Sequence, residues 1–474
     1  MSILEGLEEL LIEDLTRLHT PGHKGKDYLP NILREDIQRI DFTEIPGSDN
    51  LHNAREMILQ SEERSAKVFK ALGTYYLING TTVGIQAMIL STCNPGDKII
   101  VPRNCHRSVW SALILGDITP IYISPQTHPH TGIGLSISPE EVQSKLKQHP
   151  DIKAAIITYP TYYGSCSDIE KISKILHNEN KLLLVDEAHG AHFAIHNKLP
   201  ITALEAGADI TVQSTHKLLS SFTQSSMLHV GSNNISIERL EMFLTMLQSS
   251  SPSYPLMASL DFATKHAKEE GYKRWDNILK WTISAYNEIK DRTSMVPLGM
   301  DIIGKHGVAD FDLSKLLINV SNIGLRGTEV DKILREQYGI QVELSDYNYI
   351  LAMAGIGTEQ EDIERFTKAI IKINNLYSIH KKPPTIKINT IKEKVVLTPR
   401  EAVYSKAQDV LLKDSQGRIS KEFIIPYPPG IPIVLPGEEI TREIINIIAE
   451  IKQWGGQIIG PKDPKLNKIS VIKM

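Results

Sequence analysis

Short apolar runs alternate with amphipathic stretches through the middle of this chain. Each run is bounded by polar or turn-forming residues, a pattern typical of buried strands. Seven such runs stand out: Thr74–Ile78, Lys98–Val101, Pro120–Ile123, Ala154–Thr158, Lys181–Asp186, Ile210–Gln213 and Met227–Val230. Helical stretches lie between most of them. This alternation predicts an α/β fold with a mostly parallel seven-stranded sheet wrapped by helices.

The rest of the chain divides by pattern into smaller parts. Residues 1–60 begin with a short amphipathic helix (Leu4–Leu15) and continue as polar, turn-rich sequence. Such a segment has too little apolar content for its own core, so we expect it to pack on the rest of the protein. Residues 61–300 would form the large domain and residues 301–474 a smaller α/β domain. Within the smaller domain we expect an α/β part, a lysine-rich linker and a proline-rich end, at residues 301–376, 377–395 and 396–474.

Composition narrows the possible partners. The 474 residues carry 52 basic and 56 acidic side chains, so neither a nucleic-acid nor a membrane-surface partner is expected. Cys93, Cys105 and Cys166 cannot form a disulfide framework, and neither they nor the 16 histidines have metal-ligand spacing. No signal peptide opens the chain, and no apolar run reaches about 20 residues. We expect a soluble, cytoplasmic protein without a bound metal.

Two neighbouring runs are each followed by chemically useful residues. Lys181–Asp186 ends in an aspartate, and Ile210–Gln213 leads directly into Ser214-Thr215-His216-Lys217. Parallel strands would bring Asp186 and Lys217 to the same edge of the sheet. An amine that forms a Schiff base, beside a carboxylate that can hold a pyridinium nitrogen, is the minimum equipment for pyridoxal phosphate (PLP) chemistry. Taken singly, Asp186 could instead cap a loop and Lys217 could be a solvated lysine.

Two more strand ends carry candidate residues. Gly80, Thr81 and Thr82 follow the first strand and should open a helix, whose free amides bind phosphate. The same residues would equally serve as an ordinary helix cap. His106 follows the second strand, where an imidazole could stack on an aromatic cofactor or transfer a proton. A hydrogen-bonded structural histidine is the alternative there.

An ordered set of motifs resembles the ornithine/lysine/arginine decarboxylase family, PLP enzymes of the aspartate-aminotransferase fold (PLP fold type I). The motifs run in family order over nearly the whole chain. They are His19–Gly25 (HTPGHKG), Asp41–Leu51 (DFTEIPGSDNL), Asn79–Thr82 (NGTT), Val185–Gly190 (VDEAHG), Ser214–Lys217 (STHK), Ser250–Leu260, Thr398–Ala402 (TPREA) and Tyr427–Glu438 (YPPGIPIVLPGE). The chain looks like the short bacterial form, without the extra N-terminal regulatory domain of the long enzymes.

The resemblance implies a role for each matching residue. Lys217, Asp186 and His106 would be catalytic: Lys217 would carry PLP, Asp186 would pair with its ring nitrogen, and His106 would stack on the ring. The other cofactor contacts would be Gly80, Thr81, Thr82, Ala188, His189, Ser214, His216, Ser250 and Ser251. The two last serines would reach across a subunit boundary, which implies a homodimer or larger homo-oligomer with shared sites. Glu438, Asp41 and Glu44 would bind the basic substrate.

The implied reaction is PLP-dependent decarboxylation of a basic amino acid. We favour arginine, giving agmatine and carbon dioxide, followed by lysine to cadaverine and then ornithine, on the short form's usual association. An aminotransferase or aldolase of the same fold is an alternative, and so is a non-catalytic regulatory homologue. A regulatory homologue should have lost the lysine or the aspartate, and both are present here. A nucleotide-binding protein is disfavoured because no GxGxxG follows the first strand.

Overall fold

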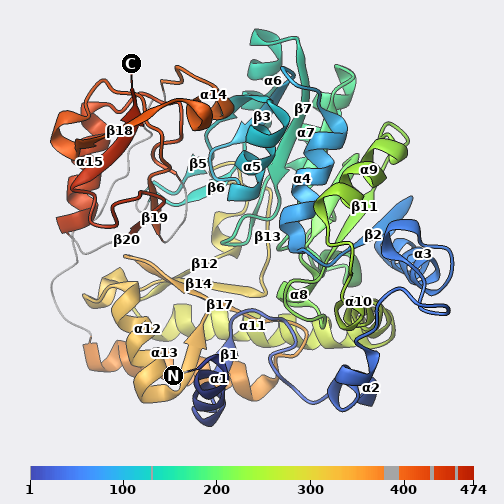
Figure 1. Ribbon diagram of the computed structural model, residues 1–474. Helices are drawn as coiled ribbons and strands as arrows, with labels where there is room; N and C mark the ends of the chain where they lie inside the picture. Colours follow the sequence, from blue (N-terminus) through green and yellow to red (C-terminus); the bar gives the residue numbers. More distant parts are fainter. Residues whose placement is uncertain (1, 130–131, 378–393, 428–431, 454–456, 474) are drawn as a thin grey trace.

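A seven-stranded sheet forms the centre of the molecule (Figure 1). The computed structural model describes residues 2–129, 132–377, 394–427, 432–453 and 457–473. In spatial order the strands are β2 (Gly73–Leu77), β11 (Ser226–Val230), β10 (Ile210–Gln213), β9 (Leu182–Asp186), β7 (Ile152–Thr158), β3 (Lys98–Pro102) and β4 (Thr119–Ile123). Of these, β11 runs antiparallel to both of its neighbours, and the other pairs are parallel. The predicted mostly parallel sheet of seven strands is confirmed.

Helices cover both faces of this sheet. On one face, α4 (Gly80–Thr92), α5 (Arg107–Gly116) and α9 (Ile237–Leu247) pack on apolar strand residues such as Val101 and Val212. On the other lie α6 (Pro139–Gln148), α7 (Ile169–Asn178) and α10 (Tyr254–His266). Because both faces are buried, β7 and β9 are apolar at most successive positions rather than alternating between apolar and polar.

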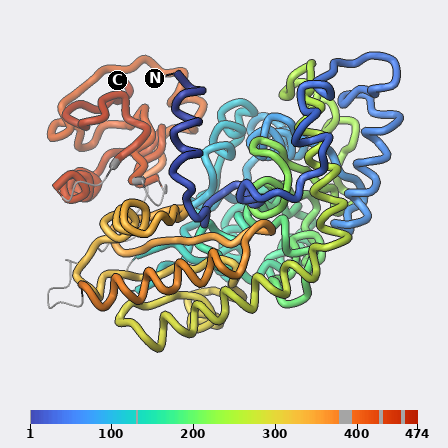
Figure 2. Tube along the Cα trace, turned by 90° about the horizontal axis from the view of Figure 1, so that it is seen from below, coloured from blue at the N-terminus to red at the C-terminus, as the bar shows by residue number. Residues whose placement is uncertain are grey.

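The small domain continues the core of the large one. Its antiparallel sheet has the order β12 (Val296–Leu298), β14 (Lys315–Asn319), β17 (Tyr349–Met353) and β16 (Leu344–Ser345). Figure 2 shows α11 (Tyr272–Arg292) beside α13 (Gln360–Tyr377), with which it packs. A further helix, α12 (Gly327–Tyr338), leads into β15 (Ile340–Val342). The buried apolar residues of these elements merge with those under the large sheet.

The C-terminal part has an apolar core of its own. It contains α14 (Pro399–Tyr404), α15 (Arg442–Gln453), and the pairs β18 (Ala407–Leu411) with β21 (Lys468–Ile472) and β19 (Ile425–Tyr427) with β20 (Gln457–Ile459). Its core includes Ile424, Val434, Ile448 and Val471. The region that the sequence suggested was merely a proline-rich end therefore has a separate hydrophobic core. Most of the expected linker, residues 378–393, and residues 428–431 of the proline-rich motif lie outside the described residues.

The N-terminal segment links to the small domain. It contains α1 (Ile3–Ile12), α2 (Asn31–Arg34), two 3-10 turns (Ile37–Ile40 and Leu51–Asn53) and, after them, α3 (Met57–Phe69). Between α1 and α2, β1 (Thr16–Leu18) pairs in parallel with β15. Two short pairs complete the strands: β5 (Gln126–Thr127) with β6 (Gly134–Ser136), and β8 (Ser165–Cys166) with β13 (Asp310–Phe311). Within the described ranges, no helix combines the length and apolarity of a membrane span.

Acid should destabilise the fold through a histidine in the central sheet. His229 on β11 is fully buried, and burial lowers its pKa to about 3. Below the ordinary histidine pKa of about 6.5, the unfolded chain takes up a proton that the folded protein excludes. Stability is therefore lost as the pH falls, by about 2 kcal/mol between pH 7 and pH 5 for this one group. Urea unfolding at both pH values should show a smaller acid loss in His229→Gln, and an unchanged loss would contradict this assignment.

Candidate active site

The aspartate and the lysine lie at adjacent strand ends, as predicted. Asp186 is the last residue of β9 and is paired with Val212 of the parallel strand β10. Only Ser214 separates the end of β10 from the short helix α8 (Thr215–Leu218), which carries Lys217. The parallel register thus brings a carboxylate and an amine to the carboxyl edge of the sheet.

The Lys217 amine lies in a largely buried environment with two carboxylates nearby. Its Nζ lies 2.8 Å from Nε2 of His189. Burial lowers the pKa of Lys217, while the charges of Asp186 and Glu343 oppose that shift. Burial, followed by the charges of Lys217 and Lys315, lowers the pKa of His189 well below its usual range. A neutral imidazole therefore accepts a hydrogen bond from a lysine that loses its proton more readily than usual, and the neutral amine is the nucleophilic form.

Asp186 is buried and has one free oxygen. Its side chain is 3% exposed, and the backbone N–H of Ala188 donates to Oδ1 at 3.1 Å. In the described part of the chain no other hydrogen bond reaches this carboxylate. Its charge opposes the lowering of the pKa of both His106 and Lys217. The free oxygen is suited to accept a hydrogen bond from a protonated ring nitrogen.

Hydroxyl groups gather where α4 begins. Thr81 Oγ1 bonds to Ser214 Oγ and, at 2.8 Å, to Ser226 Oγ, which donates to the carbonyl of Gln213 at 2.6 Å. Gly80 opens the helix with φ of 78°, a conformation that favours glycine. Because the Asn79 side chain makes no capping bond, the first amides of α4 remain available to an anion. Thr82, in the same first turn, is exposed.

Two histidines flank this arrangement. His106 is the N-cap of α5 and accepts from Ser108 N at 3.3 Å, while its ring is exposed. Burial of its environment, and then Lys217, lowers the pKa of His106, and Asp186 opposes the shift. His216 Nδ1 donates to the Ser225 carbonyl at 2.7 Å, and burial lowers its pKa to about 4, so this ring is neutral near pH 7. Stacking of His106 on a cofactor ring stays a prediction.

The His19–Gly25 turn packs directly on α8. Gly22 N donates to the His216 carbonyl at 2.8 Å, and Gly22 O accepts from Gly357 N at 2.9 Å. A Cβ on Gly22 would lie 2.4 Å from the carbonyl carbon of Leu218, so only glycine fits this close approach. The N-terminal segment and the small domain therefore both contact the lysine-bearing helix.

Two charged residues near Lys217 were missed by sequence reasoning. Glu343 lies between β15 and β16 and accepts from Thr20 N and from Tyr162 Oη, each at 2.7 Å. Its charge also acts on Lys315, whose amine is buried and donates to the Tyr162 carbonyl at 3.1 Å. Burial lowers the pKa of Lys315 to about 8. Both residues come from the small domain, and a single charge within or next to a short strand gave no sequence signal.

Glu438 does not offer a free carboxylate to a substrate, contrary to expectation. It is 2% exposed, and both its oxygens accept from the guanidinium of Arg103, with Nη2 3.1 Å from Oε2. Leu435 N also donates to Oε2 at 2.9 Å. Since the carboxylate is already satisfied, it ties the C-terminal part to the strand end that carries His106.

Removal of the Glu438 charge should therefore lower stability rather than raise a Michaelis constant. Glu438→Gln leaves the Arg103 guanidinium buried without its counter-charge, and we expect a loss of about 3 kcal/mol in unfolding free energy. The matched control is Glu439→Gln, next in sequence, whose partner Lys394 is exposed. Such an exposed pair contributes about 1 kcal/mol or less. Equal unfolding midpoints for the two variants would contradict the structural role of Glu438.

Four other predicted residues lie apart from Lys217 within this chain. Asp41, Ser250 and Ser251 are exposed, and Glu44 is half-buried. Their two segments meet where His52 Nε2 bonds to the Ser249 carbonyl at 2.8 Å. Ser249 N in turn donates to Asn79 Oδ1 at 3.1 Å, beside the Gly80 turn. No hydrogen bond or ion pair between these four residues and Lys217 or Asp186 occurs among the described residues.

The residues that do meet fit PLP. The hydroxyls and free amides at the start of α4 suit a phosphate, the free oxygen of Asp186 suits a pyridinium nitrogen, and the Lys217 amine suits an aldehyde. His189 Nδ1 is buried without a hydrogen-bond partner in the described structure, which also leaves a donor or acceptor for a ligand. Among the described residues, no group of three histidine, cysteine or acidic side chains is placed to hold a metal ion.

Comparison with known proteins gives consistent matches over the whole chain. Residues 5–362 match the model of the Orn/Lys/Arg decarboxylase major domain, and residues 385–460 match that of the C-terminal domain of the same enzymes. An arginine decarboxylase of Bacillus subtilis (strain 168) is 37% identical, covering 99% of this chain and 97% of its own length. One from Halalkalibacterium halodurans is 36% identical, covering 96% and 94%.

A solved structure supports the same fold. The lysine decarboxylase LdcF of Francisella novicida superposes with a TM-score of 0.78 at 22% identity, covering 99% of this chain and 83% of that one. At this identity the likeness is one of fold. The chain accordingly has the architecture of PLP fold type I, with a large, mostly parallel sheet and a C-terminal domain.

Proposed function

Because the chain belongs to the Orn/Lys/Arg decarboxylase family, we propose that it uses PLP to decarboxylate a basic amino acid, preferentially arginine to agmatine and carbon dioxide. Lysine would be the second choice and ornithine the third. The preference rests on four relatives named arginine decarboxylase, at 35–37% identity. The observation that carries the proposal is the placement of Lys217 and Asp186 at adjacent strand ends, with the Thr81–Ser214 hydroxyls beside them.

The proposed chemistry depends on an electron-accepting ring. PLP, when bound, withdraws the electron pair released as the bond from Cα to the carboxylate breaks. Asp186 would keep a proton on the ring nitrogen, since its charge favours the protonated form. Thr81, Ser214 and the amides of α4 would hold the phosphate and so fix the orientation of the ring.

Lys217, positioned by His189, would supply the proton that is added to Cα. Their nitrogens are 2.8 Å apart, within direct hydrogen-bond reach. Burial lowers the pKa of both groups, so His189 stays unprotonated and holds the Lys217 amine by accepting a hydrogen bond from one of its protons. Lys217 would deliver a proton to Cα after carbon dioxide leaves, which yields the amine product.

A comparison of three substrates tests the specificity. Initial rates of carbon dioxide release should give a kcat/KM at least about tenfold higher for arginine than for lysine or ornithine. Citrulline, which is uncharged at its distal end, should be a poor substrate. A higher kcat/KM for lysine would keep the decarboxylase assignment and overturn the choice of arginine.

We also propose that the active unit is a cytoplasmic homodimer or larger homo-oligomer with shared sites. Support comes from Ser250 and Ser251, which are exposed and follow Ser249, the residue that bonds to both His52 and Asn79 beside the Gly80 turn, and from Asp41 and Glu44, which make no contact with Lys217 among the described residues. A partner chain docked there would receive these side chains in its own site. The three cysteines are free and buried, which suits a reducing compartment.

Dilution tests the shared site. Specific activity should fall in parallel with the dimer fraction measured by mass photometry, because a monomer lacks the partner's serines and acids. Ser250→Ala with Ser251→Ala should weaken PLP binding without changing the unfolding midpoint. Full activity in a monomer would show that each chain contains a complete site.

A further inference from the structure

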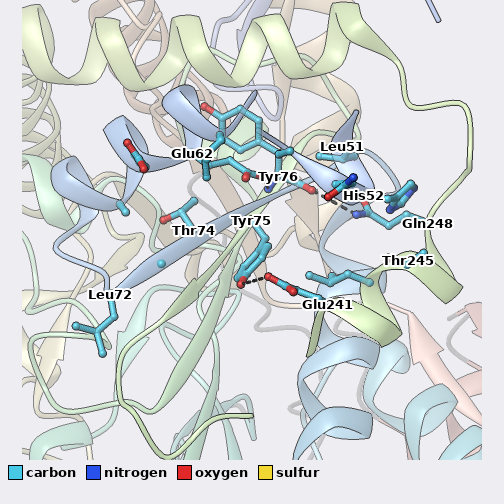
Figure 3. A pocket seen from close by; sticks show the side chains of 17 residues that line it. Leu51, His52, Glu62, Leu72, Thr74, Tyr75, Tyr76, Glu241, Thr245 and Gln248 are labelled. Carbon is cyan, nitrogen blue, oxygen red and sulfur yellow. Dashed lines mark hydrogen bonds between the residues drawn. The ribbon is translucent and has the colours of Figure 1, made fainter. Parts of the chain in front are cut away.

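A separate hollow of about 340 Å³ lies against the edge strand β2, between α3 and α9 (Figure 3). None of its lining residues belongs to the candidate active site. The lining comes from three consecutive elements, the 3-10 turn at Leu51–Asn53, α3 and β2, and from the sequence-distant helix α9. A hollow of this size lies within the usual range of small-molecule sites, roughly 300–1,000 Å³.

The lining is acidic and apolar. Three carboxylates, Glu62, Glu63 and Glu241, line the hollow, and no lysine or arginine does. Apolar side chains lie along the same walls: Leu51, Ala54, Leu59, Ala66, Leu72 and Leu244. Figure 3 shows Glu62 and Glu241 on different walls, with Tyr75 Oη donating to Glu241 at 3.0 Å. The hollow thus presents two acidic poles joined by apolar surface.

Glu62 is the strongest pointer to a ligand. It is 6% exposed, and its Oε1 accepts from Tyr76 N at 2.8 Å. No hydrogen bond or ion pair to Oε2 occurs among the described residues. A buried carboxylate without a cation is costly, and a cationic ligand would remove that cost.

Among the described residues around Glu62, no basic side chain forms an ion pair with its carboxylate. Burial, and then the charges of Asp49 and Glu241, raises the pKa of Glu62 to about 8. Asp49 is bound to backbone amides of residues 55–58, and Arg64 on the far side of α3 is paired with Asp261. His52, the one histidine among the lining residues, bonds to the Ser249 carbonyl.

We infer that this hollow is a second binding site, for a linear aliphatic amine carrying a positive charge at each end. One ammonium group would bind Oε2 of Glu62, the alkyl chain would lie along Ala66 and Leu244, and the second cation would bind Glu241. A neutral or anionic ligand would form no ion pair with Glu62 or Glu241. Diamines and guanidino-amines have the required chemistry, and the products of the proposed reaction are of that class, a correspondence that rests on the proposed function.

Titration calorimetry with 1,4-diaminobutane tests the site. The holoenzyme is first reduced with borohydride, which fixes PLP on its lysine and prevents the amine from reacting at the active site. We expect one binding event per chain. Glu62→Gln and Glu241→Gln should each weaken it by about tenfold or more, since each removes a hydrogen bond to a charged group. Glu238→Gln, an exposed position on α9 outside the hollow, should bind as the parent does.

Two further ligands test which charges the site requires. Butylamine, with one charge, should bind more weakly than the diamine, and succinate should not bind. If Glu62→Gln fails to fold, as judged by circular dichroism, Glu241→Gln against Glu238→Gln decides the matter. Absence of diamine binding at millimolar concentration, or equal affinity in parent and both acidic-pole variants, would overturn the inference. Because binding is measured without turnover, this outcome is independent of the proposed decarboxylation.

Discussion

Lys217→Ala is expected to lose catalysis and the covalent attachment of PLP together. The amine is the group that would form the Schiff base, and it is also the proposed proton donor to Cα. Loss of proton transfer alone removes up to about 10⁴-fold in rate, and loss of the covalent link adds to this. The parent should be yellow and should retain PLP through borohydride reduction and denaturation, whereas the variant should release it.

Mass spectrometry of the reduced protein locates the attachment. The PLP adduct should lie on the peptide that contains Lys217. Lys198→Ala, which removes an exposed lysine paired with Asp276, is the matched control and should keep both the adduct and full activity. An adduct that persists on another lysine in Lys217→Ala would refute the assignment.

Asp186→Asn is expected to keep PLP but to lose about a thousandfold in kcat, equivalent to about 4 kcal/mol in the barrier. The amide has the same size, yet it cannot hold a proton on the ring nitrogen by charge. The ring would then be a weaker electron acceptor when the carboxylate leaves. Turnover at saturating PLP and the PLP content after gel filtration separate the two effects.

A second aspartate supplies the control for this variant. Asp168 caps α7 by accepting from Lys171 N, and asparagine can make the same bond. Asp168→Asn should therefore have parental turnover. Near-parental turnover in Asp186→Asn would show that another group pairs with the ring nitrogen.

The sheet and its two central site residues could be predicted because their signals are local. Each strand is a short apolar run bounded by polar residues, and all seven occur in the structure. Once the strands are parallel, Asp186 and Lys217 must lie at the same edge. The turn at Gly80 could also be predicted, because a glycine followed by threonines suits a helix start.

The remaining contacts depend on residues that are distant in sequence. Arg103 lies in the large domain and Glu438 in the C-terminal part, so no local sequence pattern indicated that the two side chains form an ion pair. The charge of Glu343, a residue of the small domain, acts on Lys217 of α8. The core around Ile448 and Val471 is assembled from short elements on either side of proline-rich sequence. Local hydrophobic periodicity cannot predict such contacts, because they join residues that are distant in the sequence.

The fate of the arginine carboxylate distinguishes decarboxylation from the other reactions of this fold. Arginine labelled with ¹³C in its carboxyl group should be incubated with the PLP-loaded protein, with no keto acid added. The parent should release equal amounts of labelled carbon dioxide and agmatine, and Lys217→Ala should release neither product. Formation of a keto acid from arginine, or product formation that requires an added keto acid, would contradict the proposed decarboxylation and favour an aminotransferase.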